Sequence, residues 1–133
     1  MDREQLTDLL IKSIVNAKPR KAPENLDNGL KGAIIILKIL NDNECLSAGE
    51  LSKILDVSTA RVAVAINNLV VKGYVKKSKD KIDARKTLVT ITDLGKKELA
   101  RRENLIREHL IEKLKNLTEQ DLLSLINIIN KIE

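Results

Sequence analysis

Apolar residues recur along this chain with two different spacings, and each spacing predicts a different kind of element. Over residues 5–15 and 30–40 they return every three or four positions, which is typical of a helix with one apolar side. Between residues 74 and 92 they alternate with polar residues and are often β-branched, which predicts two strands of a hairpin with a polar tip at 79–86. The expected elements are helices at 5–15, 30–40, 48–55 and 59–72, strands at 74–78 and 88–92, and helices at 93–115 and 118–132.

Polar residues with capping chemistry stand at the ends of these predicted helices. Residues 47–50 are Ser-Ala-Gly-Glu, a capping box in which the first hydroxyl accepts from the amide of Glu50 while that carboxylate reaches back. Ser58 or Thr59 can cap the next helix, and Gly73 supplies a left-handed residue after its last turn. The other boundaries are marked by Thr92, by Thr118 with Asp121, and by a polar linker over residues 18–28 that contains Pro19 and Pro23.

The order of these elements indicates the fold class. Two helices joined by a turn of three to four residues and followed by a basic hairpin describe a winged helix-turn-helix. We therefore expect a mainly α fold with a small antiparallel β wing, in the α+β class. One compact chain of 133 residues would hold a winged helix-turn-helix lobe at 30–92 and a helical lobe made of residues 1–29 and 93–133.

The position of the positive charge changes the picture more than its size does. The whole chain carries +5, but residues 58–86 alone carry eight basic and two acidic side chains, a local charge of +6. Charge concentrated in this way is typical of a surface that meets a polyanion, and a solvated basic loop is the alternative. The charged residues of the segment are Arg61, Lys72, Lys76, Lys77, Lys79, Asp80, Lys81, Asp83, Arg85 and Lys86.

The composition excludes several classes of protein. A single aromatic residue, Tyr74, cannot supply the stacking surfaces of RNA-binding and single-strand-binding modules, so no RNA partner is expected. One cysteine, Cys45, and one histidine, His109, exclude a disulfide framework, a Cys/His metal site and an obvious set for nucleophilic catalysis. We therefore expect no enzyme, no cofactor and no metal. The longest apolar run is residues 33–37, so we expect no signal peptide, no membrane partner and a cytoplasmic protein.

Several motifs within residues 30–95 resemble a known family. Asp83-Ala84-Arg85, the strand 88–92 and Gly95 resemble the wing signature of the MarR-type (multiple antibiotic resistance regulator) transcription regulators. That signature is an Asp-x-Arg pair, a strand, and a Leu-Thr-x-x-Gly-like helix start, with Ile91 here in place of the usual Leu. Further positions that match the family are Glu50-Leu51 and residues 69–73.

The resemblance implies a function and an assembly. Members of that family are homodimers that bind palindromic operators and usually repress, their terminal helices dimerise, and many are released by a small-molecule effector bound between the lobes. For this chain the resemblance implies a sequence-specific regulator of double-stranded DNA, with residues 30–92 as the DNA-binding lobe and the terminal helices as the dimerisation lobe. Richness in Lys, Ile and Asn favours a prokaryotic source with an A/T-rich genome. A winged-helix scaffold for protein–protein contact is the alternative, although such a wing has no need to concentrate charge.

The helix 59–72 is expected to read the DNA. On a helical wheel Val62, Ile66 and Leu69 face a core, whereas small and polar residues fall opposite, where Ala60 and Val64 suit the methyl groups of thymine. Val64 stands where many relatives have Arg, and fewer arginines mean fewer guanine contacts, so we expect an A/T-rich operator. The alternative is that small residues simply favour a helix. The candidate recognition residues are Thr59, Ala60, Arg61, Val64, Asn67 and Asn68.

The hairpin tip is expected to hold DNA phosphates. Lysines there can neutralise phosphates without reading sequence, whereas Arg85 suits a narrow minor groove. Asp83 lies two residues away in a segment expected to be strand-like, where it could brace the backbone of Arg85 or a neighbouring lysine. A solvated tip is the alternative. The candidate wing residues are Lys77, Lys79, Lys81, Asp83, Arg85 and Lys86.

The terminal helices carry apolar stripes that suit a helix–helix seam. The last helix is too apolar around its circumference to be solvated, so it is either core within one chain or half of a two-fold interface. We also expect Cys45 to be a small buried side chain near a short third strand, His109 to be on the surface and Tyr74 to pack in the core. The candidate dimerisation residues are Leu6, Leu10, Ile14, Leu122, Leu125, Ile129 and Ile132.

Overall fold

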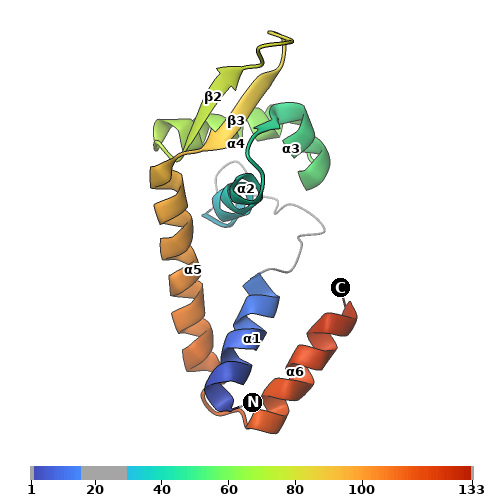
Figure 1. Cartoon of the computed structure of the whole chain (residues 1–133), viewed down its shortest axis with the longest axis vertical. Coiled ribbons are helices and arrows are strands. Elements are labelled where there is room, and N and C mark those ends of the chain that lie inside the picture. Colours follow the sequence, from blue (N-terminus) through green and yellow to red (C-terminus); the bar gives the residue numbers. More distant parts are fainter. Residues whose placement is uncertain (1, 16–29, 133) are drawn as a thin grey trace. The chain divides into compact units, whose positions relative to one another are not determined.

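A computed structural model describes residues 2–15 and 30–132 of the chain, and in that part the predicted helices and strands are all present. Their boundaries agree with the predicted ones to within two residues. The predicted polar linker at 18–28, with its two prolines, lies outside the described residues. The elements (Figure 1) are α1 (Arg3–Val15), α2 (Leu30–Asp42), β1 (Leu46–Ser47), α3 (Ala48–Leu55), α4 (Thr59–Val71), β2 (Val75–Lys79), β3 (Thr87–Ile91), α5 (Asp93–Leu114) and α6 (Glu119–Ile132).

The chain divides into two compact units. One consists of residues 19–101, and the other consists of residues 1–18 together with 102–133. Helix α5 contributes residues to both units, because the division falls between residues 101 and 102.

The unit of residues 19–101 is a mainly helical domain with a three-stranded antiparallel sheet. The strand order is β1-β3-β2, so the central strand β3 pairs on both sides. Val89 in the middle of β3 lies opposite Leu46 of β1 and Lys77 of β2, and its side chain is fully buried. The core beneath the sheet is built from buried apolar residues of α2, α3, α4 and α5, among them Ile36, Leu37, Leu40, Leu51, Leu55, Val62, Ile66, Leu69 and Leu99.

The junction between α4 and β2 depends on a glycine. Gly73 has a positive φ of 82°, a backbone conformation that side-chain-bearing residues rarely adopt. Its amide donates to the carbonyl oxygen of Val70 (2.9 Å), and the amide of Tyr74 donates to that of Leu69 (3.0 Å). These two bonds form a Schellman motif, so the predicted role of Gly73 at the end of this helix is confirmed.

The junction between β3 and α5 depends on one hydroxyl. Thr92 Oγ1 accepts from the amide of Gly95 (3.0 Å), which confirms it as the N-cap of α5. The same hydroxyl donates to the carbonyl oxygen of Gly73 (2.6 Å) and so ties the start of α5 to the end of α4.

We expect Thr92→Val to lower the free energy of unfolding by about 2 kcal/mol, because one buried amide and one carbonyl lose their partner while the side-chain volume is kept. Urea denaturation followed by circular dichroism measures the change. Thr92→Ser, which keeps the hydroxyl, is the control and is expected to lose much less. A valine variant as stable as the unaltered protein would contradict this role of the hydroxyl.

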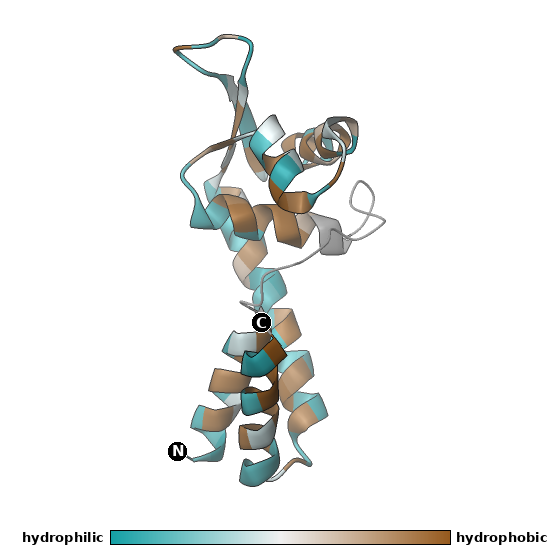
Figure 2. Cartoon of the chain, turned by 90° about the vertical axis from the view of Figure 1, so that its right-hand side faces the viewer, coloured by the Kyte–Doolittle hydropathy of each residue, from teal (hydrophilic) through white to brown (hydrophobic). Residues whose placement is uncertain are grey.

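The terminal unit is held together by α1 and α6. Leu6 and Leu10 of α1 are buried against Leu122 and Ile126 of α6, and Leu125 and Ile129 pack partly buried around them. Figure 2 shows that these helices carry both apolar and polar bands. Polar contacts add to this packing, since the Arg3 guanidinium donates to the carbonyl oxygens of Leu114, Lys115 and Leu117, Asp8 pairs with Arg107, and Thr118 and Asp121 cap α6 reciprocally.

This packing affects the seven candidate dimerisation residues. Leu6, Leu10 and Leu122 are buried within a single chain, and for the last helix this is one of the two alternatives that its apolar circumference left open. Ile14 and Ile132 are exposed, at 39% and 64% of their surface. The assignment of these residues to a dimer interface stays a prediction.

One expectation about a single residue is wrong. Cys45 is exposed, not a buried hydrophobe. Pairing of β1 with β3 begins at Leu46, whose side chain takes the inward position, and because successive side chains alternate, the residue before it faces water. His109 is exposed and Tyr74 packs half-buried against the core, as expected.

By length and composition, no single described helix could cross a membrane, whereas α3 and α4 taken together could, although this pair is bent by 113° at the break between them.

Candidate nucleic-acid interface

Helices α3 and α4 form the helix-turn-helix. The chain turns by 113° between them, within the range expected for this motif. Asp56 ends α3 with a left-handed backbone (φ 54°), and the amide of Val57 donates to the carbonyl oxygen of Ser52 (3.2 Å). The Ser52 hydroxyl also donates to the carbonyl oxygen of Val57 (2.6 Å). Two hydrogen bonds between Ser52 and Val57 therefore stabilise the turn.

Local capping orients both helices as predicted. Ser47 Oγ accepts from the amide of Glu50 (3.1 Å), and the Glu50 carboxylate accepts from the same hydroxyl (3.2 Å). At the start of α4, it is Ser58 and not Thr59 that caps, since its hydroxyl accepts from the amide of Arg61 (3.2 Å). The bonds from the amides of Glu50 and Arg61 satisfy donors that a helix start otherwise leaves without a partner, whereas the Glu50 carboxylate bonds the Ser47 hydroxyl and not a backbone amide.

Helix α4 has one buried and one exposed face. Val62, Ala65, Ile66 and Leu69 are buried, which confirms the predicted core side. The opposite face leaves apolar side chains in water, with Val64 47% exposed and Val71 87% exposed. Of the candidate recognition residues, Arg61 is half-buried, and the exposed ones are Thr59, Ala60, Val64, Asn67 and Asn68.

A contact between the helix and the wing changes the chemistry available at Asn67. Lys77 Nζ on β2 donates to Asn67 Oδ1 at 2.7 Å. Because an ammonium group can only donate, the amide must turn its oxygen towards Lys77 and its Nδ2 hydrogens away. The spacing along the sequence did not indicate this contact, because it joins residues on different elements.

The wing is a basic hairpin whose side chains beyond its base are mostly polar. Val75 is the buried residue of β2, and the four residues after it are exposed. The candidate wing residues Lys77, Lys79, Lys81, Arg85 and Lys86 are all exposed. Their charges therefore face solvent, where a polyanion can reach them.

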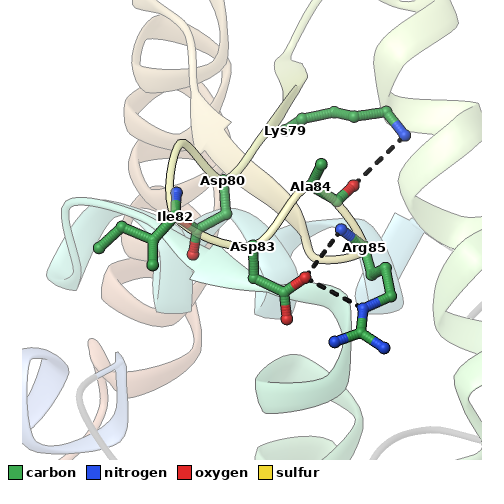
Figure 3. Close-up of polar contacts among 6 residues, drawn as sticks. All are labelled: Lys79, Asp80, Ile82, Asp83, Ala84 and Arg85. Carbon is green, nitrogen blue, oxygen red and sulfur yellow. Dashed lines mark hydrogen bonds and ion pairs between the residues drawn. The ribbon is translucent and has the colours of Figure 1, made fainter.

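The tip of the wing is a hydrogen-bonded turn and not the strand-like segment that we expected around Asp83. The amide of Lys86 donates to the carbonyl oxygen of Asp83 (3.0 Å), so the chain reverses there instead of staying extended. Asp83 Oδ1 accepts from the backbone amide of Arg85 (3.1 Å) and from its Nε (3.3 Å), as Figure 3 shows. The expected bracing of Arg85 by Asp83 is therefore confirmed. The Arg85 side chain stays 93% exposed, and an ion pair this exposed is weak enough to exchange for a phosphate.

Within the described residues, no group of three or more His, Cys, Asp or Glu side chains could hold a metal ion.

The pKa of Arg101, on α5, is raised because its guanidinium donates hydrogen bonds to Glu98 and is attracted by that carboxylate. The candidate DNA-binding residues offer positively charged groups, amide groups, apolar surface, the hydroxyl of Thr59 and the carboxylate of Asp83.

Two features of this surface were not predicted from the sequence. One is the Lys77–Asn67 bond, and the other is Ile82, which stands 97% exposed at the tip of the wing. An isolated apolar residue between charged ones was the available signal for Ile82.

Comparison with known proteins agrees with this geometry. Residues 34–110 match the family described as "Winged helix DNA-binding domain". The chain is 27% identical over 133 residues to an uncharacterized HTH-type transcriptional regulator of Bacillus subtilis, YpoP, covering 99% of this chain and 92% of that protein. It is 43% identical over 61 residues to the transcriptional regulator AdcR of Streptococcus pneumoniae, covering 46% of this chain and 41% of that protein.

The fold is that of MarR from Escherichia coli. The apo crystal structure of that protein superposes with a TM-score of 0.71 at 24% identity, covering 97% of this chain and 88% of that chain. A mutant of the same protein complexed with operator DNA superposes with a TM-score of 0.61 at 22% identity, covering 97% and 86%. The chain belongs to the winged helix DNA-binding domain family, and it is a DNA-binding transcription regulator with the fold of MarR, and not an enzyme.

Proposed function

We propose that this chain is a homodimeric repressor that binds an A/T-rich palindromic operator. Helix α4 enters the major groove, and the wing formed by β2 and β3 lies along the adjacent minor groove. The observation that carries the proposal is the exposed face of α4, where Val64 and Val71 remain in water opposite a fully packed core face. Operator DNA in the complex of the Escherichia coli protein supports duplex DNA as the partner.

The exposed face of α4 suits A·T base pairs. In the major groove, thymine presents a methyl group that Ala60 and Val64 can bury. Asn67, with its oxygen held by Lys77, offers its Nδ2 to an acceptor such as N7 of adenine. The proposed recognition residues are Thr59, Ala60, Arg61, Val64, Asn67 and Asn68.

The wing supplies affinity more than base reading. Its exposed lysines neutralise phosphates, and Arg85 lies in the minor groove, where A/T-rich DNA has the most negative potential. Asp83 positions Arg85 through the bond to its backbone amide. The proposed wing residues are Lys77, Lys79, Lys81, Asp83, Arg85 and Lys86.

The dimer forms through the two terminal parts of the chain, residues 1–29 and 93–133, while residues 30–92 bind DNA. Although α1 and α6 bury part of their apolar surface within the chain, several large apolar side chains of the terminal unit stay exposed, which supports a second chain as their partner. A two-fold dimer matches a palindrome whose half-sites lie about 34 Å apart. The exposed apolar residues are Leu9, Ile14, Leu105, Ile106, Ile111, Leu123, Ile128 and Ile132. Release by a small-molecule effector stays a prediction.

Selection of binding sites from random duplex DNA tests the proposal. We expect a palindromic A/T-rich consensus, bound with a log–log salt slope of about −7 if the dimer neutralises about eight phosphates. Val64→Ser is expected to relax the preference for thymine within each half-site without changing the slope, because it removes apolar surface but no charge.

Each part of the proposal has its own contradicting outcome. A G/C-rich consensus would rule out the thymine contacts, and a consensus without two-fold symmetry would rule out the dimeric arrangement. If competitor DNA abolishes binding, the protein binds DNA only through non-specific electrostatic attraction, and sequence-specific recognition is ruled out. Absence of DNA binding at low salt would favour a winged-helix scaffold for protein–protein contact.

A further inference from the structure

One large apolar side chain stands at the very tip of the basic wing. Ile82 is 97% exposed, the highest value among the exposed large hydrophobic residues of the described chain. A single exposed apolar residue on a helix face is common and needs no explanation. Ile82 differs because it lies on the one part of the molecule that concentrates positive charge.

Two hydrogen bonds hold the backbone around Ile82 in a turn. Asp80 Oδ1 accepts from the amide of Ile82 (2.9 Å). The amide of Asp80 donates to the carbonyl oxygen of Lys86 (3.1 Å), and this bond joins the two ends of the tip. Figure 3 shows the Ile82 side chain leaving the tip on the side away from Arg85, whose Nε is hydrogen-bonded to Asp83. An apolar side chain held outward in this way needs little further ordering before it inserts into a partner.

The neighbours of Ile82 restrict what that partner is. Residues 79–86 carry four basic side chains, Lys79, Lys81, Arg85 and Lys86, against two acidic ones, Asp80 and Asp83. The tip is therefore net positive, which favours an anionic partner that also offers an apolar surface. The minor groove of DNA has this arrangement, because phosphates line both walls while deoxyribose and base faces lie between them. Apolar wedges such as isoleucine are inserted between base pairs by several proteins that bind the minor groove.

We propose that Ile82 inserts as a wedge into the minor groove of the operator and bends the duplex there. The step it opens is a flexible pyrimidine–purine step, because such steps unstack at the lowest cost. Ile82 would then add sequence preference through deformability, at a position where no hydrogen bond to a base is made. This inference rests on the proposed function, in which the wing lies along the minor groove.

The test uses the full chain and the duplex recovered by site selection. End-to-end fluorescence energy transfer across the duplex reports bending, and 2-aminopurine placed at the step next to the wing reports unstacking. We expect Ile82→Ser to lose affinity about tenfold and to lose most of the bend and of the 2-aminopurine signal. The salt slope should stay the same, because no charge is removed.

Two matched variants serve as controls. Ile82→Leu keeps an apolar side chain and should retain the bend. Ile54→Ser removes the same side chain from α3, where it is 50% exposed, and so controls for the loss of an exposed isoleucine from the same unit. Whatever its effect on affinity, the bound duplex should keep the 2-aminopurine signal next to the wing. The thermal unfolding of all three variants should match that of the unaltered protein, since neither isoleucine belongs to the buried core.

The outcomes separate this inference from the proposed function. If Ile82→Ser binds and bends the operator like the unaltered protein while Arg85→Ala loses affinity, the wedge is wrong and the proposed function stands. If the unaltered protein binds the operator without any bend or unstacking signal, the wedge is also wrong. If the unaltered protein selects no DNA site at all, the proposed function fails and the wedge with it.

Discussion

Gly95→Ala is expected to destabilise the winged-helix unit strongly. Gly95 is buried in the first turn of α5, and a Cβ atom at this position would lie 2.1 Å from the carbonyl oxygen of Tyr74 and 2.7 Å from Cγ1 of Ile91. The Tyr74 oxygen cannot simply retreat, because it accepts a hydrogen bond from the amide of Thr92 (3.0 Å). Relief would require α5 to move off the sheet, so we expect a loss of about 3 kcal/mol or more in the free energy of unfolding.

A second helical glycine provides the control. A Cβ on Gly49, near the start of α3, would meet nothing closer than Ser47 Oγ at 3.9 Å. Gly49→Ala is therefore expected to keep the free energy of unfolding or to raise it by up to about 1 kcal/mol, because alanine favours the helix. Urea denaturation of both variants measures the two free energies of unfolding. Equal stability of the two would contradict the close approach of α5 to the end of α4.

Arg85→Ala is expected to weaken operator binding by about 10- to 100-fold and to leave folding unchanged. The side chain is 93% exposed and its one ion pair, with Asp83, is on the surface, so its removal costs little in the free protein. In the minor groove the same guanidinium would meet the most negative potential of the duplex, and two copies act in a dimer. Loss of that contact should also reduce the salt slope by about one per protomer.

Gel-shift titration at several salt concentrations measures both effects, and thermal melting monitors the fold. Lys131→Ala removes one positive charge from α6, in the other compact unit, and should change affinity much less. Arg85→Lys keeps the charge without the planar fork and should restore the salt slope but only part of the affinity. Unchanged operator affinity in Arg85→Ala would rule out the wing as the minor-groove contact.

Where hydrogen bonds are local, the sequence was sufficient to predict the structure. Ser47, Ser58 and Thr92 each bond to an amide three residues onward, and Gly73 closes the last turn of its own helix. Such contacts depend on residue type and short spacing, which can be read along the chain. The buried side of α4 followed from helical periodicity for the same reason.

Predictions were weaker where a residue's surroundings come from distant segments. Cys45 has the chemistry of a small buried residue, but the register of β1 with β3 turns Leu46 inward and leaves the cysteine in water. The apolar last helix was consistent with either one chain or two, and the packing of α1 against α6 buries both Leu6 and Leu122 within one chain.

At the candidate interface, too, local features were predicted from the sequence and contacts between distant segments were not. Composition and spacing alone located a basic hairpin after a helix-turn-helix and the exposed side of α4, because charge and periodicity are properties of the chain itself. Folding was needed to bring Lys77 to Asn67, to close the turn at Asp83 and to hold Ile82 outward. The physical reason is that a local pattern specifies which side chains an element presents, whereas the partner of each side chain is set by the packing of elements that are far apart in sequence.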